Sequence, residues 1–238
     1  MDNATYTTLT RQSGLLQEMQ VLANNIANAS TTGYRAEGIL FSEHVKALGP
    51  DTESLSMATA RVRDTVMTQG SLAQTGGTFD LAIEGDGFFL IETPQGQRLT
   101  RSGMFGPNDQ GDLVTADGYQ VLDPGGAPVF VPAGAGPIGI GADGTISANG
   151  AAIGQIGLVT PTDPNQMIRE SGTLFDSRGG IDAAPDSRIL QGFLESSNVN
   201  PIQQISRMIE VQRAYELGQG FLEKEHDRIR SVIDATRT

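Results

Sequence analysis

The sequence predicts an α+β protein in which an N-terminal and a C-terminal helix pair as a coiled-coil-like stalk. The chain between them is predicted to form a central, mainly-β domain that resembles a small barrel or sandwich. Three observations support this fold class. Apolar residues follow a three-four spacing near both ends of the chain. Short β-type segments alternate with turn signals in the middle, and 30 of the 238 residues are glycine.

The predicted boundaries divide the chain into four parts. Residues 1–34 are expected to form the first helix, 35–74 an extended or irregular link, 75–195 the acidic β domain and 196–238 the second helix. Residues 162–187, within the β domain, are expected to form a further irregular link because glycine and proline recur there.

The first helix is predicted to run from about Ala4 to Ala29. Apolar side chains at helical spacing define one of its faces: Leu9, Leu16, Met19, Leu22 and Ile26. The helix ends in the turn residues 28–33. Asn24, Asn25 and Asn28 are poor helix-interior residues. They indicate either an untidy helix end or a polar contact surface used in assembly.

The link after this helix has no regular pattern. Phe41, Val45 and Leu48 have the spacing of a short helix before Gly49-Pro50, and residues 51–69 are expected to be extended or loosely ordered. The β domain then begins with predicted strands at 80–84 and 88–91, and a last strand is predicted at 189–194.

The second helix has a clear start signal. Asn200 can accept a hydrogen bond from a first-turn N–H, and Pro201 suits the first helical position because its missing N–H costs nothing there. An apolar seam with three-four spacing follows: Ile205, Met208, Tyr215, Leu222, Ile229 and Ile233. Polar Gln212, Gln219 and His226 interrupt this seam. The gaps indicate packing against several neighbours.

Charge and composition exclude several classes of protein. The net charge is −12, and residues 51–195 carry −11 of it, while the ends are close to neutral. An acidic middle repels phosphate groups, so neither nucleic acid nor anionic lipid is an expected partner. The absence of cysteine excludes disulfides and thiolate metal sites. No apolar run is long enough for a transmembrane helix, and the first residues lack the features of a cleavable signal peptide.

No group of residues predicts catalysis. A G-x-G-x-x-G pattern at 134–139 contains Pro137, and further glycines follow it, so a turn is expected there in place of a nucleotide site. His44 and His226 are far apart in the sequence and have no second ligand at metal-binding spacing. The acidic residues at 80–86 indicate a strand end and a turn. We therefore expect no catalytic residues, no cofactor and no metal.

Three stretches together resemble the flagellar basal-body rod protein family. Residues 22–34 (LANNIANASTTGY) resemble the family's signature at the end of its first helix, and 81–89 (LAIEGDGFF) resemble the entry to the β domain. Residues 197–200 (SNVN) with 208–216 (MIEVQRAYE) resemble its C-terminal signature. The phrase at 100–105 (TRSGMF) is similar to that of proximal-rod members, since distal-rod relatives more often have an acidic residue at the position of Ser102.

This resemblance implies an axial structural protein without catalytic activity. Its partners would be other flagellar rod proteins, copies of itself and the flagellar type III export apparatus. It would be exported without a cleavable signal peptide and would lie in the rod that spans the periplasm, where it would transmit torque. Distal-rod or hook-type axial proteins are the alternatives within the family. A secreted β-domain ligand-binding module on a helical stalk and a carboxylate enzyme are the alternatives from other classes.

The predicted assembly interface combines the apolar faces of the two helices with the polar residues of the family signatures. Its members are Leu9, Leu16, Met19, Leu22, Asn24, Asn25, Ile26, Asn28, Asn198, Val199, Asn200, Ile205, Met208, Ile209, Gln212, Arg213, Tyr215, Leu222 and Ile229. Apolar stripes that a lone subunit leaves exposed can become the core of a helical array.

Overall fold

The computed structural model describes residues 2–46 and 55–236, and the chain divides into two compact units. The helix–hairpin unit comprises Met1–Ala27, Ala36–Val66 and Asn200–Thr238. The β unit comprises Asn28–Arg35 and Met67–Val199. The two predicted helices and the mainly-β middle are therefore confirmed, but residues 28–35 belong to the β unit and 36–66 to the helical one.

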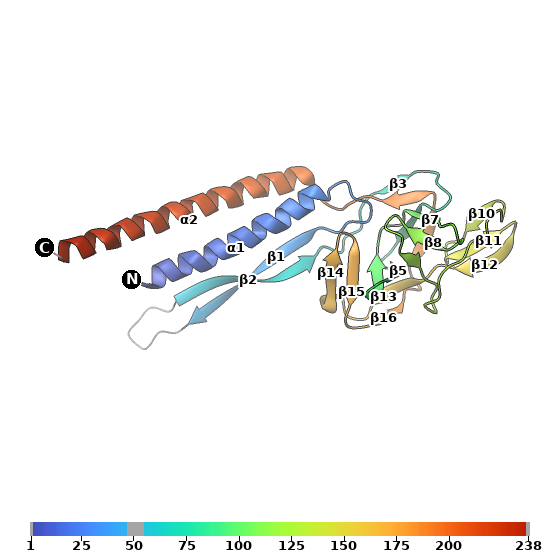
Figure 1. The fold of residues 1–238 in the computed structure, drawn as a ribbon, viewed down its shortest axis with the longest axis horizontal. Helices are drawn as coiled ribbons and strands as arrows, with labels where there is room; N and C mark the ends of the chain where they lie inside the picture. Colours follow the sequence, from blue (N-terminus) through green and yellow to red (C-terminus); the bar gives the residue numbers. More distant parts are fainter. Residues whose placement is uncertain (1, 47–54, 237–238) are drawn as a thin grey trace. The chain divides into compact units, whose positions relative to one another are not determined.

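The helix–hairpin unit contains two long helices, α1 (Asp2–Ala27) and α2 (Pro201–Thr236), and the hairpin of β1 (Glu37–Lys46) and β2 (Leu55–Thr65). Helix α1 lies between α2 and the hairpin (Figure 1). The start of α2 is as the sequence predicts. Asn200 Oδ1 accepts hydrogen bonds from the backbone N–H groups of Ile202 at 3.1 Å and Gln203 at 3.2 Å.

The two helices run antiparallel, as three polar contacts between them show. Gln12 Nε2 donates to the carbonyl oxygen of Tyr215 at 2.9 Å, and Arg207 Nε donates to Glu18 Oε1 at 2.8 Å. Asn25 Nδ2 donates to Gln204 Oε1 at 3.1 Å. A residue later in α1 thus meets a residue earlier in α2.

Few of the apolar side chains whose burial is described in these elements are fully buried. Val21 and Leu22 of α1 and Val211 of α2 are buried, whereas the predicted seam residues of α2 are half-buried or exposed. The side of α2 that faces α1 is therefore centred on Val211, which the predicted seam did not include.

The segment 35–74, expected to be an extended or irregular link, contains a regular hairpin that the sequence did not predict. Strands β1 and β2 pair in register from Glu37↔Thr65 to Lys46↔Leu55, with one bulge at Leu40/Phe41. The short helix suggested by Phe41, Val45 and Leu48 is also wrong, because β1 continues to Lys46; residues 47–54 lie outside the described residues. Pairing with a distant strand and packing on α1 decide the conformation here, and local spacing does not.

The β unit is built on an antiparallel sheet whose strands are hydrogen-bonded in the order β14-β15-β6-β5-β9-β8-β7, with β13 and β16 attached at β5. These strands are β5 (Phe88–Thr93), β6 (Gly96–Thr100), β7 (Phe105–Pro107), β8 (Leu113–Thr115), β9 (Gln120–Val121), β13 (Leu158–Pro161), β14 (Met167–Ser171), β15 (Leu174–Ser177) and β16 (Ile181–Ala183). Among the described strands none joins β14 to β7, so the sheet is open and a closed barrel is not confirmed.

Smaller sheets complete the β unit. Strand β3 (Leu72–Gln74) pairs with β18 (Phe193–Glu195), and β4 (Leu81–Glu84) pairs with β17 (Arg188–Gln191). Strands β10 (Ile138–Ile140), β11 (Thr145–Ala148) and β12 (Ala151–Gln155) form a three-stranded sheet. The predicted last strand at 189–194 is therefore two strands, which Gly192 separates at a φ of +76°.

Strand β5 lies at the centre of the β unit and is buried on both faces. Phe89 and Ile91 belong to one buried apolar cluster, and Phe88 and Leu90 to another. Alternate side chains of a strand point to opposite faces, so β5 contributes to two cores. This explains why its sequence is a continuous apolar run.

The second predicted irregular link, 162–187, is also wrong in most of its length. It contains the short 3₁₀ helix η1 (Pro164–Gln166) and the strands β14, β15 and β16. Phe175 of β15 is fully buried and packs edge-on against Phe88, with ring centroids 5.9 Å apart. The glycines in this segment lie at turns between ordered strands.

Two glycines of α2 provide a matched test of helix packing. A Cβ at Gly218 would lie 2.3 Å from Gln12 Nε2, whereas a Cβ at Gly220 would meet nothing within 4 Å. We expect Gly220→Ala to stabilise the protein by about 0.5–1 kcal/mol through helix propensity. Gly218→Ala should lose this gain because the Gln12 amide must move. Denaturant unfolding followed by the helical circular dichroism signal measures both; equal gains would contradict the packing described.

Candidate assembly interface and its buried ionic junction

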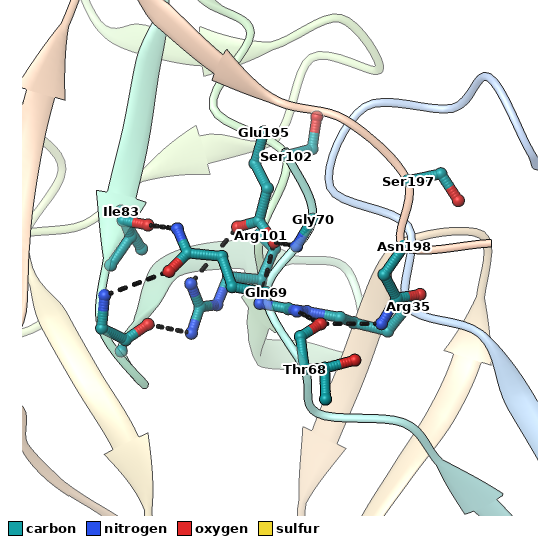
Figure 2. A network of polar contacts seen from close by, with 12 residues as sticks. Arg35, Thr68, Gln69, Gly70, Ile83, Arg101, Ser102, Glu195, Ser197 and Asn198 are labelled. Carbon is teal, nitrogen blue, oxygen red and sulfur yellow. Dashed lines mark hydrogen bonds and ion pairs between the residues drawn. The ribbon is translucent and has the colours of Figure 1, made fainter. Parts of the chain in front are cut away.

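A cluster of three buried charges lies in the β unit. Glu195, the last residue of β18, binds Arg35 Nη2 through Oε1 at 2.9 Å and Arg101 Nη1 through Oε2 at 3.3 Å. Each of the three side chains is only 1% exposed. Figure 2 shows the carboxylate between the two guanidinium groups. We call these three residues the ionic junction.

Backbone groups complete the ionic junction. Arg101 Nη2 donates to the carbonyl oxygen of Gly85 at 2.6 Å, and Arg35 Nη1 donates to that of Thr68. The N–H of Gly70 donates to Glu195 Oε1 at 2.9 Å (Figure 2). Because each charge is removed from water, these hydrogen bonds and the ion pairs must offset its lost hydration.

The turn after α1 brings Arg35 to this position. Gly33 has a φ of +69°, and a Cβ there would lie 2.3 Å from the backbone nitrogen of Ser102. The N–H of Gly33 also donates to the carbonyl oxygen of Glu195 at 2.7 Å. Only glycine combines this left-handed conformation with so close an approach. The stretch at 22–34, which resembles the family signature, therefore ends in a turn that packs against Ser102 and binds Glu195.

Arg169 also holds residues 34 and 35 in place. Its guanidinium lies 4.4 Å from the ring centroid of Tyr34 and 4.6 Å from that of Phe175, and it donates to the carbonyl oxygen of Arg35. Sequence reasoning missed Arg169 because it lies in the segment expected to be irregular. No local pattern connects it to Tyr34.

The electrostatics of the ionic junction leave an excess of positive charge. Burial lowers the pKa of Arg101 to about 10, and repulsion from Arg35 adds to this effect. Attraction to Glu195 and Asp86 opposes it. Burial also lowers the pKa of Arg35. Arg101 remains charged at neutral pH, so the arrangement is suited to holding chain segments together.

Residues of the ionic junction, or backbone groups that bind them, lie close in sequence to every point at which the chain passes between the two units. These points follow residues 27, 35, 66 and 199. Asn198 Nδ2 donates to the carbonyl oxygen of Thr68 at 2.8 Å, and its N–H donates to that of Tyr34 at 3.3 Å. The family signatures at 22–34 and 197–200 therefore meet in the β unit.

The predicted interface residues fall into three groups. Leu22, Asn25 and Val199 are buried within this chain. Met19, Ile26, Asn28, Asn198, Met208, Tyr215 and Leu222 are partly exposed. Leu9, Leu16, Asn24, Asn200, Ile205, Ile209, Gln212, Arg213 and Ile229 are exposed.

Asn25 shows what the polar helix end does within one subunit. Its Nδ2 donates to the carbonyl oxygen of Glu37 at 2.8 Å, and its Oδ1 accepts from the N–H of Glu37 at 3.0 Å. It thus pairs with the first residue of β1 as a neighbouring strand would. At this asparagine, a polar residue in a helix serves to attach the hairpin.

The described residues indicate neither a metal site nor a membrane-spanning helix. The described residues contain no group of three or more histidine, aspartate or glutamate side chains placed to hold a metal ion. Over the same part of the chain, no helix is long and apolar enough to cross a membrane. The described residues form a β unit with its own apolar cores and helices that leave apolar side chains exposed, as is typical of subunits that assemble with other chains.

Comparison with known proteins identifies the family. "Flagella basal body rod protein" matches residues 6–35, "Flagellar hook protein FlgE/F/G D1 domain" matches 82–148, and "Flagellar basal body rod FlgEFG protein C-terminal" matches 190–234. The flagellar basal-body rod protein FlgF of Caulobacter vibrioides is 39% identical over 98% of each chain. The chain belongs to the flagellar basal-body rod protein family. The family is structural and not enzymatic, which confirms that expectation.

Other relatives agree. FlgF of Mesorhizobium japonicum is 38% identical over 91% of this chain and 90% of its own length, and FlgF of Salmonella typhimurium is 36% identical over 91% of each. The basal-body rod protein FlgG of Bacillus subtilis is 28% identical over 98% of each chain. The resemblance found in the sequence is thereby confirmed.

Two glutamates of the β unit test the ionic junction. Glu195→Gln removes the carboxylate that, alone among the described residues, contacts both buried arginines, so it should destabilise the β unit by about 3–5 kcal/mol. Glu170→Gln is the matched control, because Glu170 pairs with Arg98 at 2.6 Å but is 38% exposed. Glu170 is partly exposed and Arg98 keeps Asp176 at 4.0 Å, so the control should lose clearly less stability. Urea unfolding of both variants measures this; similar losses would refute the structural role of the ionic junction.

Proposed function

We propose that the chain is a structural subunit of the proximal part of the flagellar basal-body rod. The observation that carries this proposal is its similarity, over at least nine-tenths of each sequence compared, to proteins named flagellar basal-body rod protein FlgF. The lower identity to FlgG-named relatives favours a FlgF-like role over a distal-rod or hook-type one.

Assembly through the terminal helices is the second part of the proposal. Ile202 and Leu217 of α2 are each 77% exposed, and Leu9 and Leu16 of α1 are 51% and 46% exposed. Apolar surface of this extent is unfavourable in water and is typical of surfaces that other chains cover. In the proposed rod, α1 and α2 pack in a coiled-coil-like manner against helices of other rod proteins and of further copies.

The remaining parts of the proposal follow from this role. The subunit is delivered by the flagellar type III export apparatus, takes its place in the part of the rod that crosses the periplasm, and transmits torque without inserting into a membrane. Its interface with neighbours is heterologous, because a head-to-tail contact that does not close on itself generates a helical array. The β unit then carries most of the net charge, and the helices carry little of it.

Charged substitutions on the exposed helix faces test the proposed function. In a strain whose own gene is deleted, Leu16→Asp and Ile209→Asp should fail to restore swimming, because a carboxylate cannot be buried unpaired in a packed interface. Leu16→Met and Ile209→Leu keep the surface apolar and should restore it. Swimming in soft agar and the length of the rod in isolated basal bodies are the measurements.

The outcomes separate assembly from folding. The β unit of each aspartate variant should keep its unfolding midpoint, since Leu16 and Ile209 belong to the other unit. Normal swimming of both aspartate variants would refute the proposed assembly surfaces. Normal swimming of the deletion strain itself would refute the proposed rod function.

A further inference from the structure

One asparagine of this sequence precedes a glycine, and it lies in a tight turn of the β unit. Asn149 and Gly150 connect β11 to β12, and the residues on either side of them, Ala148 and Ala151, pair with each other (Figure 1). Asn149 has a φ of +50° and Gly150 a φ of +84°. Successive positive φ values define a type I′ turn, for which this dipeptide is favoured. The turn therefore explains the choice of residues.

The same dipeptide is chemically reactive. The backbone nitrogen of Gly150 can attack Cγ of Asn149, because glycine has no side chain to hinder the approach. A bond forms between this nitrogen and Cγ, and the bond between Cγ and Nδ2 breaks. Nδ2 leaves as ammonia and takes the proton of the Gly150 N–H. Water then opens the cyclic imide at either of its carbonyl carbons, which leaves aspartate or isoaspartate at position 149.

The folded turn opposes this reaction. Ring closure requires the Gly150 nitrogen to lie on the same side of the Cα–C bond of Asn149 as Cβ, whereas a type I′ turn places it on the opposite side. The Asn149 side chain is also held in place, since its Nδ2 donates to the carbonyl oxygen of Ala135 at 2.8 Å. Local opening of the hairpin must therefore precede the attack, although Asn149 is exposed to water.

Asn149 also fastens the loop at 132–137 to the hairpin. The carbonyl oxygen of Ala135 accepts from Nδ2 of Asn149, and the carbonyl oxygen of Pro137 accepts from its N–H at 3.3 Å. Gly136 lies between these two acceptors, and a Cβ there would be 2.6 Å from Asn149 Oδ1. The absence of a side chain at Gly136 thus makes room for the asparagine.

The 132–137 loop covers apolar residues of the β unit. Residues of the loop form one wall of a hollow of about 260 Å³, which Phe79, Val131 and Ile138 also line. Val131 is buried in one of the two apolar cores, and Phe79 and Ile138 pack against that core. Displacement of the loop would therefore expose part of this core to water.

We propose that Asn149 is a deamidation site that the folded hairpin protects, and that its deamidation releases the 132–137 loop. An aspartate at this position has no Nδ2 donor, and its carboxylate faces the carbonyl oxygen of Ala135, which can only accept. Isoaspartate in addition lengthens the backbone by one atom within a turn that has no room for it. The inference concerns the β unit alone and does not depend on the proposed function.

Deamidation rates of the full chain test the protection. The purified protein is incubated at mildly alkaline pH, either folded or in guanidinium chloride, and mass spectrometry of the peptide that contains position 149 measures the conversion. Conversion should be at least about tenfold slower in the folded protein, because opening must precede attack. Equal rates would overturn the inference, and so would the absence of conversion in guanidinium chloride.

Two glycines of the loop provide a matched pair of variants. Gly134 and Gly136 have φ values of +75° and +81°, so alanine strains the backbone at both. A Cβ at Gly134 meets nothing within 4 Å, whereas a Cβ at Gly136 displaces the Asn149 amide. Gly136→Ala should raise the rate in the folded protein about fivefold, which corresponds to one lost hydrogen bond, relative to Gly134→Ala. Equal rates in the two folded variants would overturn the protective role of the side-chain bond.

Hydrogen exchange tests the release of the loop. The N–H of Ala135 donates to the carbonyl oxygen of Pro132 at 3.1 Å, so its exchange reports on the loop. Asn149→Gly keeps the positive φ but removes the side chain, and it should speed exchange at Ala135 about fivefold. Asn149→Asp, which has the product's carboxylate, should speed it at least as much. Exchange at Ile91 in β5 should not change; unchanged exchange at Ala135, or faster exchange at both sites, would overturn the inference.

Discussion

The β unit depends on one carboxylate held between two guanidinium groups. Glu195, Arg35 and Arg101 are almost completely removed from water, and only their mutual attraction and a few backbone hydrogen bonds offset the lost hydration. Displacement of Glu195 would leave two buried arginines without the carboxylate that they share, whereas displacement of either arginine would remove one of the two ion pairs. The ionic junction holds together segments that are far apart in the sequence: the turn after α1, residues 68–70 and the end of β18.

The position of the ionic junction gives it a mechanical meaning in the proposed role. The chain passes between the two units four times, and each passage follows or precedes a segment that the junction or its neighbours hold by hydrogen bonds. A subunit that transmits torque needs connections that do not slip in register. Charged hydrogen bonds with fixed directions resist slipping better than apolar contacts, which tolerate displacement.

Features set by adjacent residues could be predicted from the sequence, and features set by distant partners could not. Asn200 and Pro201 predicted the start of α2 to the residue because a helix cap is a local interaction. The hairpin at 37–65 and strands β14 to β16 were missed because their pairing partners and packing, such as Phe175 against Phe88, decide their conformation. The ionic junction joins residues separated by 66 to 160 positions, and no periodicity marks them. The signatures at 22–34 and 197–200 pointed to its neighbourhood without revealing that Asn25 and Asn198 bond within the chain.

The two units differ in how much of their apolar surface a single chain buries. Strand β5 is covered on both faces, so the β unit has two apolar cores of its own. In α2, by contrast, Val211 alone is recorded as a fully buried apolar side chain among the described residues, and most other apolar positions remain open to solvent. The charge follows the same division, since the β unit carries −9 of the net charge of −12 and the helix–hairpin unit carries −3. Like-charged β units keep free subunits apart in solution, whereas near-neutral helices can pack closely once neighbours cover them. The apolar surface that α1 and α2 leave uncovered is thus compatible with solubility before assembly because the acidic β unit belongs to the same chain.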